Sequence, residues 1–252
     1  SALRVRALKP EMVLQLETND VMALWSFFSG AKRRVGIRRQ TFGRLFNLHN
    51  ALQEGGQSAL LFYLGFLDAL GEEADGFRTE LFAAEKKVPA RPPVVFIHPG
   101  ARLAERLWPA ACWVELIALI RKQYPQVKIR IARSRFDAAV CAELFALVPR
   151  SWHCEWREIH DFAGLCAATA DASLALTLDS APRHVAAAYD IPTVSLLAHW
   201  IVKDWGIYDD ARHGVVLSHT ARPDYGIHTI PVAAVFAEFV KRFGKSGRRR
   251  KK

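Results

Sequence analysis

Three short segments of the chain carry side chains that could bind a phosphorylated ligand. The guanidinium of Arg106 could hold a phosphate through two parallel hydrogen bonds. Asp179 or Ser180 can cap a helix that begins within DSAPRH, residues 179–184, and the free amides and positive dipole end of a helix start suit a diphosphate. The carboxylate of Asp137 could accept hydrogen bonds from ribose hydroxyls. Together these residue types indicate a nucleotide site.

Each of these segments also has an ordinary structural interpretation. Residues 179–184 could form the start of a well-capped structural helix, and Asp137 could simply cap another helix. The nearby turn His98-Pro99-Gly100 could let a ligand approach the backbone closely at Gly100, but it fits an ordinary turn equally well. The elements around the three segments are therefore needed to choose between the interpretations.

Strands that alternate with helices are predicted to position these segments. Continuous apolar runs are typical of strands that are buried on both faces, and they predict strands at 94–97, 127–132, 172–177 and 193–197. Helices are predicted at 109–124, 136–147, 159–169, 181–189 and 232–243, with Pro109 in a first turn. The alternation predicts βαβ units and a parallel α/β sheet. Ligands of such sheets bind beyond the carboxyl ends of the strands, where the three segments fall.

The first ninety residues have a different character from the rest. A short strand is predicted at 12–16, and helices are predicted at 21–28 and 58–70. Pro89 to Pro93 is rich in proline and is interpreted as a linker. At about 150 residues per domain, 252 residues allow two modest domains. We therefore expect one domain over 1–90, a second over 91–243 and a basic disordered tail over 244–252.

Positive charge is concentrated in two places. The formal net charge is +10, and the last twelve residues, KRFGKSGRRRKK, contain eight basic residues and no acid. This tail could be a solvated disordered end, a contact for anionic lipid headgroups or a nucleic-acid contact, but no recognisable nucleic-acid motif accompanies it. A second cluster, Lys32, Arg33 and Arg34, could be either a solvated edge or a wall that faces an anionic substrate.

Several classes of protein are disfavoured by what the sequence lacks. It contains no phosphate-loop, dinucleotide-dehydrogenase, nucleophile-elbow or zinc-protease motif. The four cysteines are scattered without a C-x-x-C pair, which favours reduced thiols in the core and gives no zinc site. No apolar run approaches the roughly 18–20 residues that span a bilayer, and no signal pattern is present. We expect a cytoplasmic protein.

Three ordered segments resemble glycosyltransferase family 9, the ADP-heptose:lipopolysaccharide heptosyltransferases. VVFIHPGAR…RLWPAACWVELIALI looks like the opening of that family's C-terminal domain, and DSAPRHVAAAYDIPTVSLL looks like its D-[ST]-G-x-x-H-x-A-A-A…P-T signature. SGAKRRVGIRR is similar to a segment of its N-terminal domain. The resemblance covers about residues 8 to 243 and implies a GT-B fold of two Rossmann-like domains with parallel sheets, of which the N-terminal domain is incomplete.

The resemblance also implies a function and a site. It implies an inverting transfer of heptose or a related sugar from a nucleoside diphosphate to a lipopolysaccharide core acceptor, with no cofactor and no required metal. Residues 91–243 would bind the donor, and 1–90 would be the acceptor side, with Lys32, Arg33 and Arg34 suited to an anionic lipid-linked oligosaccharide. The expected donor-binding residues are Arg106, Asp137, Asp179, Ser180, Ala181 and His184. The general base is expected upstream of Ser1, and the basic tail could hold the protein at the inner face of a bacterial inner membrane.

Departures from the family pattern leave a second function open. Ala181 stands where the signature has glycine, and Arg106 stands where the family usually has lysine. With the start of the N-terminal domain absent, these departures also fit a degenerate protein that binds a nucleotide sugar without catalysis. A nucleic-acid-associated protein that works through its tail is a third interpretation.

Overall fold

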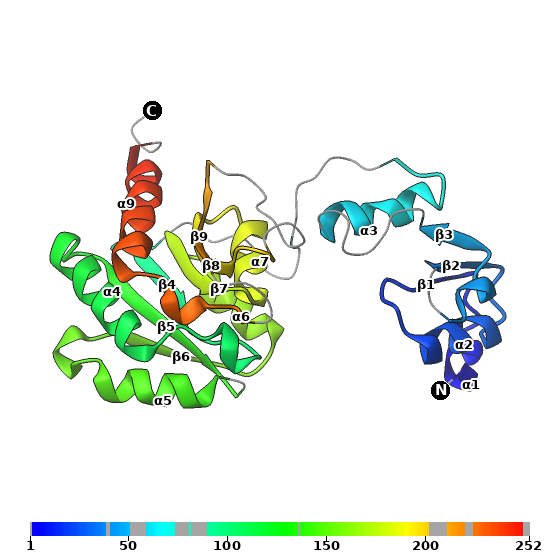
Figure 1. The fold of residues 1–252 in the computed structure, drawn as a ribbon, viewed down its shortest axis with the longest axis horizontal. Coiled ribbons are helices and arrows are strands. Elements are labelled where there is room, and N and C mark those ends of the chain that lie inside the picture. Colours follow the sequence, from blue (N-terminus) through cyan, green and yellow to red (C-terminus); the bar gives the residue numbers. More distant parts are fainter. Residues whose placement is uncertain are drawn as a thin grey trace. The chain divides into compact units, whose positions relative to one another are not determined.

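The computed structural model describes residues 2–38, 41–50, 59–73, 81, 90–135, 137–201, 211–219 and 224–248, with side chains up to residue 244 (Figure 1). The chain forms two compact units, and the division along the sequence falls between Phe77 and Arg78. The side chain of Leu81 already packs against the second unit's core. The linker predicted at Pro89 to Pro93 follows this division, and its first residue lies outside the described residues.

The first unit is built on a small parallel sheet with strand order β1-β2-β3. Its elements are α1 (Ala2–Ala7), β1 (Met12–Leu14), α2 (Asp20–Phe28), β2 (Arg33–Ile37), η1 (Gly43–Leu45), β3 (Leu48–Asn50) and α3 (Ala59–Asp68). Val35 of β2 pairs with Leu48 of β3. Val35 and Phe62 belong to a core cluster of β2 and α3 residues. The predicted strand and both helices are therefore present, although the strand is shorter than predicted and Ser58 lies outside the described residues.

The second unit contains a larger parallel sheet, whose described strands have the order β6-β5-β4-β7-β8-β9. These strands are β4 (Val94–His98), β5 (Lys128–Ser134), β6 (Glu155–Ile159), β7 (Leu174–Leu178), β8 (Thr193–Ala198) and β9 (His213–Ser218). The chain runs from β4 outward to β6 in one direction and then crosses back to continue from β7 in the other. The strand order therefore reverses between β4 and β7, which is where open α/β sheets bind ligands.

Helices cover both faces of this sheet (Figure 1). They are α4 (Ala110–Gln123), α5 (Ala138–Leu147), α6 (Phe162–Thr169), α7 (Ala181–Ala188) and α9 (Val232–Arg248), with short turns η2 (Ala104–Arg106), η3 (Arg150–Trp152) and η4 (Ile227–Thr229). Val95 and Ile97 belong to one core cluster together with residues of α4, α5 and α9, whereas Phe96 belongs to another with residues of α6 and α7. This alternation follows because successive side chains of a strand point to opposite faces.

In the second unit, two strands and several helix boundaries differ from the predictions, and in the first unit α1 and β3 were not predicted. β6 and β9 were not predicted, because β6 reads EWREI and both are edge strands without a long apolar run. The helix predicted from residue 159 instead begins at Phe162, where Asp161 caps it by accepting a 2.7 Å hydrogen bond from the Gly164 amide. Pro109 occupies the N-cap position of α4 and not its first turn.

The last helix extends further than predicted. α9 was expected to end at residue 243, but its backbone continues to Arg248. Basic residues near a helix C-terminus favour this extension, because they complement the negative end of the helix dipole. Residues 249–252 of the expected disordered tail lie outside the described residues.

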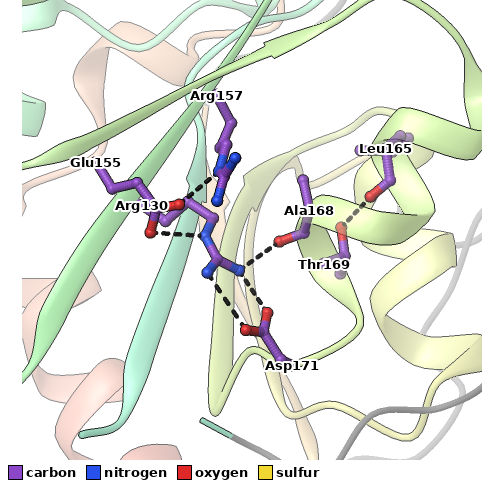
Figure 2. A network of polar contacts seen from close by, with 7 residues as sticks. All are labelled: Arg130, Glu155, Arg157, Leu165, Ala168, Thr169 and Asp171. Atoms are coloured by element: carbon purple, nitrogen blue, oxygen red, sulfur yellow. Dashed lines mark hydrogen bonds and ion pairs between the residues drawn. The ribbon is translucent and has the colours of Figure 1, made fainter. Parts of the chain in front are cut away.

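The buried side chain of Arg130 links three parts of the second unit near the ends where the strands begin (Figure 2). Arg130 of β5 is 7% exposed. Its guanidinium donates to Glu155 of β6 at 3.1 Å, to the carbonyl oxygen of Ala168 at 2.9 Å and to both carboxylate oxygens of Asp171. The Asp171 carbonyl in turn accepts a hydrogen bond from the Ala90 amide at 3.0 Å. The network therefore fixes β5, β6 and the turn before β7 relative to one another.

Replacing Arg130 with methionine should lower the free energy of unfolding by about 3 kcal/mol, since it removes the shared partner of two carboxylates and leaves the carbonyl of Ala168 unpaired. Urea denaturation followed by circular dichroism measures this loss. Arg157→Met is the matched control, because Arg157 is largely exposed and contacts only Glu155 of this pair of carboxylates; its loss should stay below about 1 kcal/mol. Equal losses for the two variants would contradict this assignment.

Candidate functional site

A cavity of about 660 Å³ opens beyond the carboxyl ends of the strands in the second unit. Its walls come from the segments that follow β4, β5, β6 and β7, and a cavity of this size can take a ligand the size of a nucleotide. The described residues that line it are His98, Gly100, Ala101, Arg102, Ser134, Asp137, Ile159, His160, Asp161, Phe162, Leu165, Ser180, Ala181 and Pro182. It therefore lies at the point where the strand order reverses.

The start of α7 forms one side of the cavity. Ser180 is the N-cap residue of α7, with an extended backbone, and its hydroxyl does not cap the helix. The Ser180 Oγ atom is buried and has no hydrogen-bond partner among the described residues. Ala181 is exposed and also lines the cavity. A ligand with acceptor oxygens could satisfy this hydroxyl and benefit from the positive end of the helix dipole.

Asp179 interacts with two arginines, Arg106 and Arg183, next to the start of α7. One carboxylate oxygen accepts a 3.1 Å hydrogen bond from Nη1 of Arg106, and the other lies 3.7 Å from Nη2 of Arg183. Nη2 of Arg106 donates to the hydroxyl of Tyr225 at 2.7 Å, and the guanidinium stacks on that ring at 4.5 Å from its centre. Arg106 and Asp179, predicted as separate ligand contacts, are therefore partners of each other.

The histidine of this segment carries no charge at neutral pH. Burial, with a further contribution from the neighbouring Arg183, lowers the pKa of His184 to about 4. Burial also lowers the pKa of Arg183, against the opposing effect of Asp179. His184 can therefore offer a hydrogen bond to a ligand but not a positive charge.

Asp137 lies in the cavity wall and is held from two sides. Its Oδ1 atom accepts a 2.6 Å hydrogen bond from the Ser134 amide, and its Oδ2 atom lies 3.3 Å from Nε2 of His98. It occupies the N-cap position of α5, but its side chain does not bond to the helix amides. Burial lowers the pKa of His98 while the Asp137 carboxylate opposes that shift.

Gly100 gives space to this carboxylate. A Cβ atom at position 100 would lie 2.0 Å from Oδ2 of Asp137, a distance that no real contact allows. The glycine was expected to admit a ligand to the backbone, and the structure shows that a side chain of the protein already occupies that approach. Gly100 therefore shapes the cavity wall by leaving room for the side chain of Asp137.

The structure brings some of the predicted residues to the cavity and not others. Asp137, Ser180 and Ala181 line it, whereas Arg106, Asp179 and His184 are not among the lining residues.

The basic cluster belongs to the first unit, at the amino end of β2, and not at the carboxyl end where ligands of parallel sheets bind. Arg34 donates to the carbonyl oxygens of Leu45 and Ala31, and Arg33 donates to that of Leu70 at 3.3 Å. Lys32 is exposed.

Sequence reasoning missed the wall that follows β6. Ile159, Phe162 and Leu165 give the cavity an apolar side, and Phe162 is 53% exposed there. The sequence predicts a helix over 159–169 and no strand directly before it, so these residues are not expected to follow a strand end and line a binding site. The sequence analysis also gives no role to Arg102, although it lies two residues after Gly100 of the His98-Pro99-Gly100 turn and lines the cavity.

The described part of the chain contains neither a cluster of side chains placed to hold a metal ion nor a helix that could span a membrane. Among the described residues, no group of three or more histidine, cysteine, aspartate or glutamate side chains is placed to hold a metal ion. Within the same part of the chain, none of the helices combines the length and apolarity required for a membrane crossing.

Solved structures of heptosyltransferases have the same fold as this chain. The similar structures include a family 9 glycosyltransferase from Veillonella parvula, with a TM-score of 0.79 and 14% identity over 97% of this chain and 78% of that one. Heptosyltransferase II of E. coli gives a TM-score of 0.71 and 15% identity, with 98% and 80% covered. E. coli heptosyltransferase WaaC with ADP gives 0.68 and 15%, with 96% and 76% covered. These confirm the predicted GT-B class with parallel sheets.

The family itself is shown by the sequence. No curated protein sequence matches the chain. Residues 4–230, however, match the family described as glycosyltransferase family 9 (heptosyltransferase), in agreement with the resemblance carried by the three ordered segments. The chain therefore belongs to glycosyltransferase family 9, the heptosyltransferase family.

Proposed function

We propose that the protein is an inverting glycosyltransferase that moves heptose, or a related sugar, from a nucleoside diphosphate to a lipopolysaccharide core acceptor. The cavity beyond the carboxyl ends of the strands carries this proposal, because an unpaired hydroxyl and a helix start meet an apolar wall there. The structures of WaaC with ADP and with ADP-2-deoxy-2-fluoro heptose supply the donor class.

The walls of the cavity suggest how the donor lies in it. The base would pack on the apolar side, where the ring of Phe162 offers a stacking surface. The diphosphate would take the opposite side, where Ser180 and Ala181 begin α7. Asp137 would accept a hydrogen bond from a ribose hydroxyl, although both of its oxygens already have neighbours within the protein.

The same groups would assist the chemistry. Breaking the bond between sugar and phosphate leaves negative charge on the departing nucleoside diphosphate, and donors fixed in advance around that charge lower the barrier. Asp179 would act from behind, by holding Arg106 and Arg183 in place. The base that deprotonates the acceptor hydroxyl is assigned to no residue of this chain.

The acceptor side of the proposal rests on charge. Lys32, Arg33 and Arg34 would attract an anionic lipid-linked oligosaccharide through their charge, and Arg34 is held in place by its hydrogen bonds to two backbone carbonyl oxygens of the first unit. The basic tail would hold the protein at anionic headgroups of the inner face of a bacterial inner membrane, at about 1 kcal/mol for each basic residue near the surface. Sedimentation with anionic lipid vesicles, compared between the full chain and a chain that lacks residues 244–252, tests whether the tail binds lipid headgroups and not nucleic acid.

Ala181 provides a sharp test of the donor site. Ala181→Glu should weaken ADP binding at least tenfold, because it places a carboxylate where the diphosphate is proposed to lie. The fold should not suffer, since Ala181 is exposed and an acidic residue in the first turn of a helix is favourable. Isothermal titration calorimetry measures the affinity, and Ala181→Gln is the neutral control of nearly equal size.

The outcomes separate the proposed function from its alternative. Unchanged ADP affinity in Ala181→Glu would contradict the placement of the diphosphate. Donor binding by the wild-type protein without sugar transfer or donor hydrolysis, in assays with ADP-heptose, would favour a non-catalytic nucleotide-sugar-binding protein of the same fold.

A further inference from the structure

The cavity holds few positive charges for a ligand that carries several negative ones. Arg102 is the only lysine or arginine among the described residues that line it. The same lining includes the carboxylates of Asp137 and Asp161, which would repel a diphosphate. Unless a cation reaches the ligand, the charges of this lining oppose its binding.

The two arginines nearby are already engaged. Arg106 donates one η nitrogen to Asp179 and the other to Tyr225, and its guanidinium also stacks on the Tyr225 ring. Arg183 is 3% exposed and lies beside the same carboxylate. Arg106 keeps one free donor, its Nε–H group, but its side chain does not line the cavity, so it would have to move away from Asp179 and Tyr225 to reach a phosphate there. The sequence-based choice of Arg106 as the phosphate contact therefore has a structural cost that Arg102 does not have.

Arg102 is free to respond to a ligand. It is exposed, and the structure gives its side chain no hydrogen bond, ion pair or ring contact with any described residue. The turn that carries it is nevertheless well defined, because Ala101 is buried and His98 Nδ1 contacts the carbonyl oxygen of Gly100 at 3.1 Å. A fixed backbone with an unpartnered guanidinium suits a residue whose partner arrives with the substrate.

We propose that Arg102 is the cation that contacts the diphosphate of the donor, and that Arg106 is a positioning residue held by Asp179 and Tyr225. This inference rests on the proposed function. It assigns the contact to a residue four positions after the end of β4 and not to the arginine that the family pattern indicates. The guanidinium can give two parallel hydrogen bonds to phosphate oxygens, which a lysine cannot match.

Calorimetric titration of the full chain with ADP and with adenosine tests the assignment. Arg102→Ala should weaken ADP binding at least tenfold and leave adenosine binding unchanged, because adenosine has no phosphate. Arg102→Lys should recover part of the ADP affinity through its charge alone. The dependence of ADP affinity on salt should become weaker in Arg102→Ala, since an ionic contact is lost.

A control and a stability measurement complete the experiment. Arg150→Ala removes the same charge at an exposed position of η3 and should change neither ligand's affinity. Thermal unfolding should give the same midpoint for Arg102→Ala as for the wild type, because the side chain has no partner among the described residues.

Failure of this inference can be distinguished from failure of the proposed function. If the wild type binds ADP, and Arg102→Ala binds it equally well, the assignment of Arg102 is overturned while the donor site stands. An equal loss of adenosine and ADP binding in Arg102→Ala would also overturn it, because that result indicates a structural role. If the wild type binds none of ADP, UDP and GDP, the proposed function fails and the inference fails with it.

Discussion

Replacing Asp179 with alanine should lower the free energy of unfolding by about 3 kcal/mol and reduce donor affinity at least tenfold. The carboxylate is the shared partner of Arg106 and Arg183, and Arg183 has almost no access to water that could replace it. Removing one partner of a buried pair leaves an uncompensated charge, which typically costs about 3–5 kcal/mol. Urea denaturation measures the stability, and calorimetry with ADP measures the affinity.

Two further variants make this result specific. Asp179→Asn keeps the size and one acceptor oxygen but loses the charge, so its stability should fall between those of the wild type and Asp179→Ala. Glu158→Ala removes a carboxylate that pairs with Arg133 at the surface and should cost less than about 1 kcal/mol. A loss for Asp179→Ala as small as that for Glu158→Ala would show that the two arginines do not depend on Asp179.

Gly100→Ala should destabilise the second unit by about 2 kcal/mol or more and impair donor binding. The added methyl group would overlap the carboxylate of Asp137, and overpacking of this kind costs about 1–3 kcal/mol in a well-packed interior. Asp137 can yield only by giving up its contacts with the Ser134 amide and His98. Thermal unfolding and ADP titration report the two effects.

A double-mutant cycle tests the cause of this effect. In Asp137→Ala the obstructing carboxylate is gone, so adding Gly100→Ala to that variant should cost much less than adding it to the wild type. Gly244→Ala is the control for adding a methyl group elsewhere. No atom lies within 4 Å of a Cβ at that position, and alanine is the better helix former by about 1 kcal/mol. Additive losses in the cycle would mean that Asp137 is not the obstacle.

The sequence predicts the centre of the second unit well and its edges poorly. β4 and β7 are central strands with continuous apolar runs, which have a simple physical cause in burial on both faces. β6 and β9 are edge strands among those described. Three of the five residues of β6 are charged, so its sequence does not resemble that of a strand buried on both faces. The apolar wall at Phe162 could not be predicted without β6, because binding residues are expected only after strands that the sequence reveals.

In the candidate site, the sequence predicts which residues lie near one another but not how their side chains pair. Asp137, Ser180 and Ala181 each follow a strand, and they line one cavity because the carboxyl ends of parallel strands meet at one edge of the sheet. Nothing in the spacing shows that Arg106 and Asp179, which are 73 positions apart, bind each other. That pairing depends on the tertiary arrangement, and it decides which arginine is available to a ligand.

The course of α9 has a consequence for how the protein could be tethered. α9 starts two residues after Ile230, whose carbonyl oxygen accepts a hydrogen bond from Trp108, a residue that follows the carboxyl end of β4. Phe239 and Phe243 pack on Tyr124, just before the amino end of β5. The carboxyl end of α9 therefore lies on the side of the sheet where the strands begin, away from the carboxyl ends of the strands that border the cavity. A surface that captures this end of the chain would leave the mouth of the cavity open, so that small molecules exchange freely while the protein stays attached.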